Sequence, residues 1–146
     1  MIPHIYPPTY RVWAILAIAV MLGWTTTAWG DAPYVLSVEQ LKRALDKARS
    51  PKDKGFILVD VRTPEEHQSG YIPGTDFNID FREIQERHRE LGAKPDDHIV
   101  VYCQSGHRSN IAANILVDLG YKYVYNVAGS MNAWQAAGYP VEYPKR

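Results

Sequence analysis

The sequence contains one cysteine, Cys103, among 146 residues, and it has no net charge, because 16 Lys and Arg balance 16 Asp and Glu. A single cysteine cannot form an internal disulfide, and the pattern of the chain offers no zinc site. Dense clusters of basic residues are also missing, which argues against a nucleic-acid-binding protein. Residues 31–146 lack internal repeats, low-complexity tracts and linkers, so we expect one globular domain.

The first thirty residues differ from the rest of the chain. Arg11 is their only charged side chain, an apolar run of thirteen residues follows from Val12 to Trp24, and the small residues Ala28 and Gly30 come next. This layout is typical of a secretory signal peptide. We therefore expect residues 1–30 to be a signal peptide and residues 31–146 to form the domain, exported to the bacterial periplasm.

A retained membrane anchor is the alternative interpretation of this segment. Residues 12–30 are nineteen uncharged residues, and a spanning helix needs about twenty apolar ones. Three threonines at 25–27 weaken that interpretation. In either case residues 31–146 face an extracytoplasmic compartment, where an unpaired cysteine suggests a free and reactive thiol.

Strand-like and helix-like segments alternate after residue 33. The sequence predicts buried strands at 55–61, 98–103 and 123–129, each a nearly continuous run of apolar residues. A first short strand leads into a helix that Ser37 caps, with Gln40 completing a capping box. Further helices are predicted at 81–91, through 111–119 and at 130–137, with a short acidic turn at Glu65 and Glu66 after Pro64. This alternation is typical of an α/β domain with a mostly parallel sheet and helices on both faces.

Two of these helices are predicted from apolar spacing. In the first, the buried side is expected to carry Phe81, Ile84, His88 and Leu91, with His88 in a structural role. In the second, the buried side is expected to carry Ile111, Ile115, Leu116 and Leu119, before Gly120 ends the helix.

The position of Cys103 indicates a functional site. It lies at the carboxyl end of a predicted strand and directly before a helix, which is where ligands collect in open α/β sheets. In the loop "CQSGHRS", Gly106 allows a curled backbone whose N–H groups point inward, and the helix N-terminus adds partial positive charge. With Arg108 and His107 nearby, these features lower the pKa of a thiol. The sequence predicts that Cys103 is a nucleophile.

Three separated motifs resemble a single-domain rhodanese. They are "LVDVRTPEEHQSGYIPGTDFNI", "VVYCQSGHRSNIAANIL" and "VYNVAGSMNAWQAAGYPV", and together they cover nearly all of residues 35–142. The resemblance implies the rhodanese-like three-layer sandwich, in which helices cover both faces of a mostly parallel sheet. One departure is Tyr71, where the family more often has histidine, but this loop residue lies outside the cysteine loop.

The resemblance also implies an activity, that of a thiosulfate sulfurtransferase. Cys103 would take a sulfane sulfur from thiosulfate or a similar donor, carry it as a persulfide, and pass it to cyanide, a small thiol or a protein thiol. No metal or cofactor is implied. The substrate would bind to the loop residues Gln104, Ser105, Gly106, His107, Arg108 and Ser109.

Several charged residues around this loop have separate predicted roles. Arg108 is expected to attract an anionic donor, because its charge opposes the helix dipole without another local reason. Asp60 and Arg62 end the neighbouring strand, where a structural ion pair or turn-capping role is favoured over substrate contact. His67 has no companion at the spacing of a metal site.

Two rival functions are weighed against the sulfurtransferase. Phosphatases and arsenate reductases related to this fold also place an arginine after a loop cysteine, but their loops are longer than the four residues that separate Cys103 from Arg108 here. A persulfide carrier or a non-catalytic rhodanese-like interaction module is the other alternative. The physiological donor and acceptor, the pathway and the oligomeric state stay open.

The N-terminal pattern leads to a prediction about processing. When the full chain is expressed in a bacterium with intact export, the mature protein should be found in the periplasm and should begin at Asp31, as N-terminal sequencing or intact mass would report. Recovery of the uncleaved chain in the membrane fraction would instead favour the retained anchor.

Overall fold

A five-stranded parallel sheet forms the centre of the molecule in the computed structural model, which describes residues 32–48 and 50–145. The strand order is β1-β5-β4-β2-β3. The strands are β1 (Tyr34–Leu36), β2 (Ile57–Asp60), β3 (Phe77–Asn78), β4 (His98–Tyr102) and β5 (Tyr123–Val127). The helices are α1 (Val38–Lys47), α2 (Pro64–Gln68), α3 (Ile84–Arg87), α4 (His107–Asp118) and α5 (Ser130–Ala136), with 3₁₀ turns η1 (Pro51–Asp53) and η2 (His88–Leu91).

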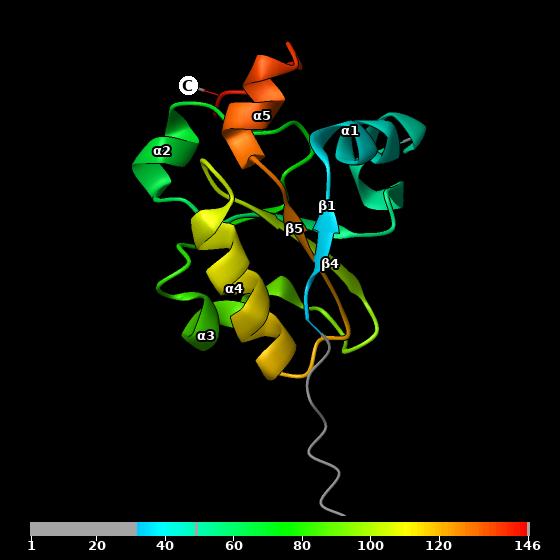
Figure 1. Ribbon diagram of the computed structural model, residues 1–146, viewed down its shortest axis with the longest axis vertical. Coiled ribbons are helices and arrows are strands. Elements are labelled where there is room, and N and C mark those ends of the chain that lie inside the picture. Colours follow the sequence, from blue (N-terminus) through cyan, green and yellow to red (C-terminus); the bar gives the residue numbers. More distant parts are fainter. Residues whose placement is uncertain (1–31, 49, 146) are drawn as a thin grey trace, which may run out of the picture.

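Helices cover both faces of the sheet, so the domain has three layers (Figure 1). On one face α3 and α4 pack against Val59 and Val101, and on the other α1 and α5 pack against Leu58 and Val100. Successive residues of β2 and β4 thus enter opposite cores, which explains why these strands are continuous apolar runs in the sequence. The predicted α/β class and mostly parallel sheet are confirmed.

Local signals in the sequence set several element boundaries. The Ser37 hydroxyl accepts a hydrogen bond from the Gln40 N–H, and the Gln40 side chain accepts one from the Ser37 N–H, so the predicted capping box is present. The acidic turn after Pro64 is the helix α2, capped in the same way by Thr63 and Glu66. These capping residues supply partners for backbone groups that a helix end would otherwise leave unpaired.

Two of the predicted helices differ from the structure. Residues 81–91 do not form one helix, because α3 has a single turn before the tighter η2, which ends at Gly92 with a φ of 61°. His88 is structural, since its Nδ1 lies 2.9 Å from the Tyr121 hydroxyl. Ile111 on α4 and Leu119 just after it were expected to be buried, but they are 37% and 39% exposed. Leu116 is buried and Ile115 packs against the core, as predicted, and the rest of the buried face is made by Ser109, Ala112 and Ala113.

The short strand β3 was not predicted from the sequence. It lies in a segment rich in turn residues, and it consists of two residues, both of which pair with β2. Such a short edge strand gives no periodic signal, which is why the segment reads as a loop.

The parallel register brings three chain segments together at the carboxyl edge of the sheet. Asp60 at the end of β2 pairs with Tyr102, the last residue of β4, and Val101 pairs with Asn126 on β5. The loops after these strands therefore lie beside one another, and Cys103 is in the middle one.

The predicted signal peptide of residues 1–30 and the cleavage site before Asp31 lie outside the described residues. Within 32–48 and 50–145, no helix is long and apolar enough to cross a membrane.

Candidate active site

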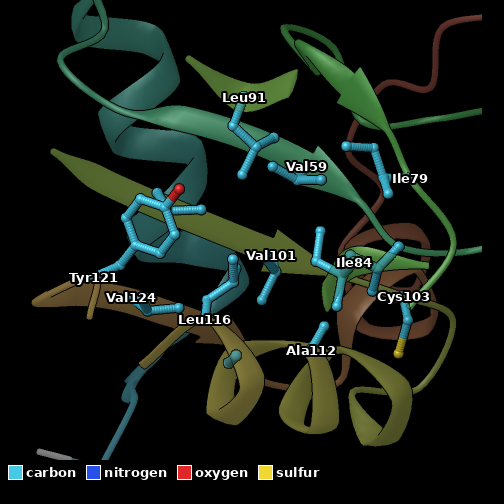
Figure 2. Close-up of a cluster of buried hydrophobic side chains, with 13 residues drawn as sticks. Val59, Ile79, Ile84, Leu91, Val101, Cys103, Ala112, Leu116, Tyr121 and Val124 are labelled. Carbon is cyan, nitrogen blue, oxygen red and sulfur yellow. The ribbon is translucent and has the colours of Figure 1, made fainter. Parts of the chain in front are cut away.

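Cys103 is the first residue after β4, and its side chain is completely buried. Figure 2 shows it at one end of the core cluster that contains Val101, Ile84 and Ala112, with its sulfur turned toward α4. A buried sulfur has no water to stabilise a negative charge. The loop and helices around it must supply the donors.

Gly106 provides one of these donors. Its backbone N–H donates to the Cys103 Sγ at 3.1 Å, and its φ of 100° is the left-handed conformation that turns the chain from the loop into α4. A Cβ at this position would also lie 3.3 Å from the backbone nitrogen of Gly129. A glycine is therefore required both by the backbone angle and by the close approach of the loop before α5.

Ser109, in the first turn of α4, provides a second donor from its hydroxyl, which lies 3.3 Å from the Cys103 Sγ. Burial alone would raise the pKa of the Cys103 thiol. The hydrogen bonds from the Ser109 hydroxyl and from the backbone of Ser109, Gly106 and Ser105 outweigh burial, so the pKa is lower than its ordinary value. The loop geometry favours the thiolate.

The start of α5 holds the backbone of the cysteine loop in place. The Ser130 hydroxyl accepts a hydrogen bond from the Cys103 N–H at 3.0 Å and donates to the Val127 carbonyl at 2.9 Å. The Met131 N–H donates to the Cys103 carbonyl, and the Asn132 N–H donates to that of Gln104. Ser130 adopts a φ of 47°, which is rare for a residue with a side chain and marks the strain of this junction. Sequence reasoning missed Ser130, because nothing in the chain order links it to Cys103.

Arg108 is paired with Glu66 of α2. Two hydrogen bonds of 2.8 and 2.7 Å, one from each outer nitrogen of the guanidinium, reach the two carboxylate oxygens. The hydrogen bonds from Arg108 outweigh the effect of burial and lower the pKa of Glu66 to about 2. The expectation that Arg108 has no local partner is wrong. Glu66 was recognised in the sequence only as part of an acidic first turn, so this pairing was missed.

Asp60 and Arg62 form a buried ion pair with an N–O distance of 2.6 Å. Burial would raise the pKa of Asp60, but hydrogen bonds from His67 and Arg62 outweigh it and lower the pKa. Arg62 also donates to the Gly70 carbonyl at 2.7 Å and reaches the Gln104 Oε1 at 3.4 Å. The pair thus ties the end of β2 to the α2 loop and to the cysteine loop, in a structural position.

The remaining loop residues form the outer part of the site. Ser105 and His107 are exposed at the surface beside the buried sulfur. The Gln104 side chain donates to Asn132 at 2.6 Å, so it is held toward α5. His67 stacks on Tyr71 with ring centroids 4.3 Å apart, and Tyr71 pairs with Glu142 in an isolated bridge. Tyr71 is thus linked to the site through His67, whose Nδ1 lies 3.0 Å from the Asp60 Oδ2.

This arrangement matches a known family. A profile described as a rhodanese-like domain matches residues 37–137. The chain belongs to the rhodanese-like domain family. A thiosulfate sulfurtransferase of Pseudomonas syringae, GlpE, is 36% identical over 97 residues, which are 66% of this chain and 88% of the relative.

Two further relatives agree with this membership. The thiosulfate sulfurtransferase PspE of Escherichia coli is 37% identical over 71 residues, 49% of this chain and 67% of PspE. The human single-domain sulfurtransferase TSTD1 has 29% identity and a TM-score of 0.59, over 72% of this chain and 96% of TSTD1. These relatives support sulfurtransferase or persulfide chemistry in general for the rhodanese-like domain described here.

The lowered thiol pKa leads to a prediction about reactivity. Because the loop hydrogen bonds stabilise the thiolate, the rate of alkylation of Cys103 by iodoacetamide should rise with pH around a midpoint below 9.0, the ordinary value. The same chain unfolded in urea loses these bonds and should show a higher midpoint. Equal midpoints for the folded and unfolded chains would show that the loop does not stabilise the thiolate.

Proposed function

We propose that this rhodanese-like protein is a sulfurtransferase that moves a sulfane sulfur from thiosulfate, or a similar donor, to cyanide or a thiol through a persulfide on Cys103. The observation that carries this proposal is the buried Sγ held by the Gly106 N–H and the Ser109 hydroxyl. These hydrogen bonds stabilise the thiolate, so Cys103 can act both as a nucleophile and as a leaving group, and the proposed reaction requires no metal or cofactor.

In the first half of the reaction the Cys103 thiolate attacks the outer sulfur of thiosulfate. The S–S bond of the donor breaks, and sulfite leaves with its electron pair. A new S–S bond joins the transferred sulfur to Cys103, and the negative charge now lies on that outer sulfur. Backbone N–H groups of the loop and the N-terminus of α4 are the donors closest to this charge.

In the second half a nucleophilic acceptor attacks the outer sulfur of the persulfide. With cyanide the product is thiocyanate, and with a thiolate it is a new persulfide. The S–S bond to Cys103 breaks and its electron pair returns to Sγ, which regenerates the thiolate. The hydrogen bonds that lower the thiol pKa also make Cys103 a better leaving group in this step.

The size of the loop favours sulfur transfer over phosphate hydrolysis. The four residues between Cys103 and Arg108 place the Gly106 N–H 3.1 Å from the sulfur itself. A phosphate ester needs a wider nest of donors for its three non-bridging oxygens. Arg108 is also held by Glu66, which engages two of its five N–H donors.

Residues 1–30 support a further part of this proposal, that the reaction takes place in the periplasm. Their layout of a basic residue, an apolar run and small residues is the support. The acceptor there is either a small molecule or a protein thiol, and an assay with cyanide beside a panel of small and protein thiols distinguishes these acceptors.

The persulfide itself is directly measurable. Incubation of the purified protein with thiosulfate should add one sulfur atom to Cys103 by intact mass, and cyanide should remove it. Because the chain has no second cysteine, Cys103→Ser should abolish both events completely. Turnover in the serine variant, or hydrolysis of aryl phosphates that depends on Cys103, would contradict the proposed function.

A matched pair of variants tests the part played by Arg108. Arg108→Ala removes the cation and should raise the KM for thiosulfate several-fold, whereas Glu66→Gln frees the cation from its partner and should lower that KM. Neither change should alter the KM for an uncharged persulfide donor, because the effect is attraction to the charge of the donor.

Steady-state kinetics with both kinds of donor provide the comparison. If Arg108→Ala impaired charged and neutral donors equally, Arg108 would have only a structural role with Glu66. If Glu66→Gln also raised the KM for thiosulfate, the carboxylate would be needed to position Arg108 rather than to offset its charge.

A further inference from the structure

The Ser109 hydroxyl has one hydrogen and three neighbouring acceptors. The Asn126 Oδ1 lies 2.7 Å from its oxygen, the Cys103 Sγ 3.3 Å, and the Ser130 Oγ 3.4 Å. A serine hydroxyl donates only one hydrogen bond. Because Ser109 is completely buried, water cannot donate a hydrogen bond to an acceptor that the Ser109 hydroxyl leaves unpaired.

Two of these acceptors compete directly for the Ser109 hydrogen. Ser130 already accepts from the Cys103 N–H and donates its own hydrogen to Val127, so its contact with Ser109 is the longest of the three. The Asn126 Nδ2 faces the Gly106 carbonyl at 3.4 Å, which leaves its Oδ1 facing Ser109. The hydrogen therefore goes either to Asn126 or to the Cys103 sulfur.

The charge on the sulfur decides between them. When Sγ is a neutral thiol, the short bond to Asn126 is the better one, and the thiol S–H is free to donate to the Ser109 oxygen. When Sγ is an anion, the charge-assisted bond from Ser109 to sulfur is favoured. The Asn126 oxygen, on a side chain that is 8% exposed, then loses its short bond.

We propose that Asn126 is a positioning residue that controls, through the single hydrogen of the Ser109 hydroxyl, how strongly Cys103 is stabilised as an anion. The inference rests on the proposed sulfurtransferase function. The inference assigns a role in that function to Asn126 on β5, which acts on the sulfur through Ser109.

This competition matters differently in the two half-reactions. In the persulfide the negative charge is on the outer sulfur, so Ser109 donates to Asn126. When the acceptor breaks the S–S bond, the electron pair arrives on Sγ and the hydroxyl turns toward it, without any proton transfer. By holding the hydroxyl away from sulfur, Asn126 makes Cys103 a stronger nucleophile and a poorer leaving group.

Other charged groups near the sulfur are left unchanged by the test. Arg108 on α4 is paired with Glu66 on α2, and Asp80 interacts with Arg108 electrostatically. Arg62 is paired with Asp60 and contacts the Gln104 side chain, and His107 is exposed in the first turn of α4. Their effect on the thiol is common to all variants compared, so it cancels.

A double-mutant cycle tests the proposal. Asn126→Val keeps a residue that favours strands and removes the acceptor, so the pKa of Cys103 from the pH dependence of alkylation should fall by about half a unit to one unit. Ser109→Ala should raise this pKa. In the Ser109→Ala background, Asn126→Val should have no further effect. The same shift in both backgrounds would overturn the proposal, since Asn126 would then act through the loop backbone.

Two controls keep the test decisive. Asn114→Ala changes an exposed asparagine on α4 and should leave the pKa unchanged. If the valine variant does not fold, Asn126→Asp replaces it in the cycle, because aspartate has nearly the same shape as asparagine. Its carboxylate binds the Ser109 hydrogen more strongly, so the pKa should rise, and the rise should be smaller in the Ser109→Ala background. An equal rise in both backgrounds would overturn the proposal.

The rates of the two half-reactions complete the experiment. At a pH above the Cys103 pKa of both proteins, where the thiol is fully ionised, Asn126→Val should load from thiosulfate more slowly than the wild type and should discharge to cyanide faster, by several-fold each, as followed by intact mass. If both steps slowed together, the role of Asn126 in transfer would be wrong. If the wild type acquired no sulfur, the proposed function would fail, whereas the pKa cycle would still report on Asn126 and Ser109.

Discussion

A negative charge on a completely buried sulfur is the constraint on which the site depends. Cys103 has no exposed surface, so the thiolate exists only if the protein supplies its hydrogen-bond donors. Those donors come from a loop that curls back on its own first residue, with Gly106 in a conformation that glycine adopts easily. Much of the surrounding structure serves to hold that loop in its curled form.

Three strands share this task because their carboxyl ends meet at one edge of the sheet. After β4 comes the loop itself, and after β5 comes the strained junction at Ser130, whose hydroxyl fixes the Cys103 backbone. At the end of β2, the buried pair of Asp60 and Arg62 contacts Gln104 and the Gly70 carbonyl. Breaking one partner of such a pair leaves an unpaired buried charge, which typically costs about 3–5 kcal/mol. The loop is therefore anchored to the ends of both neighbouring strands.

The sequence was sufficient to predict the parts that depend on local pattern. Apolar runs marked β2, β4 and β5, and a capping box marked the start of α1. Prediction from the sequence failed where tertiary contacts determine which residues are buried or brought together. Leu116 is buried as predicted, but Ile111 and Leu119 are exposed, and the small residues Ser109, Ala112 and Ala113 form the rest of the face that α4 packs against the sheet and the cysteine loop. Cys103 was found because strand, loop and helix are contiguous, whereas Glu66, Asn126 and Ser130 approach it from separate elements with no local signal.

The pairing of Arg108 with Glu66 bears on how reactive the sulfur is. An uncompensated cation beside Cys103 would stabilise the thiolate further, and a more stable thiolate is a weaker nucleophile toward the donor. Glu66 offsets this charge at 2.7 Å, so the backbone and hydroxyl donors dominate the stabilisation of the sulfur. Hydrogen bonds of this kind act at short range on Sγ and its immediate neighbour. In the proposed reaction they can therefore follow the charge as it moves between the inner and outer sulfur, whereas a fixed cation would favour one position throughout.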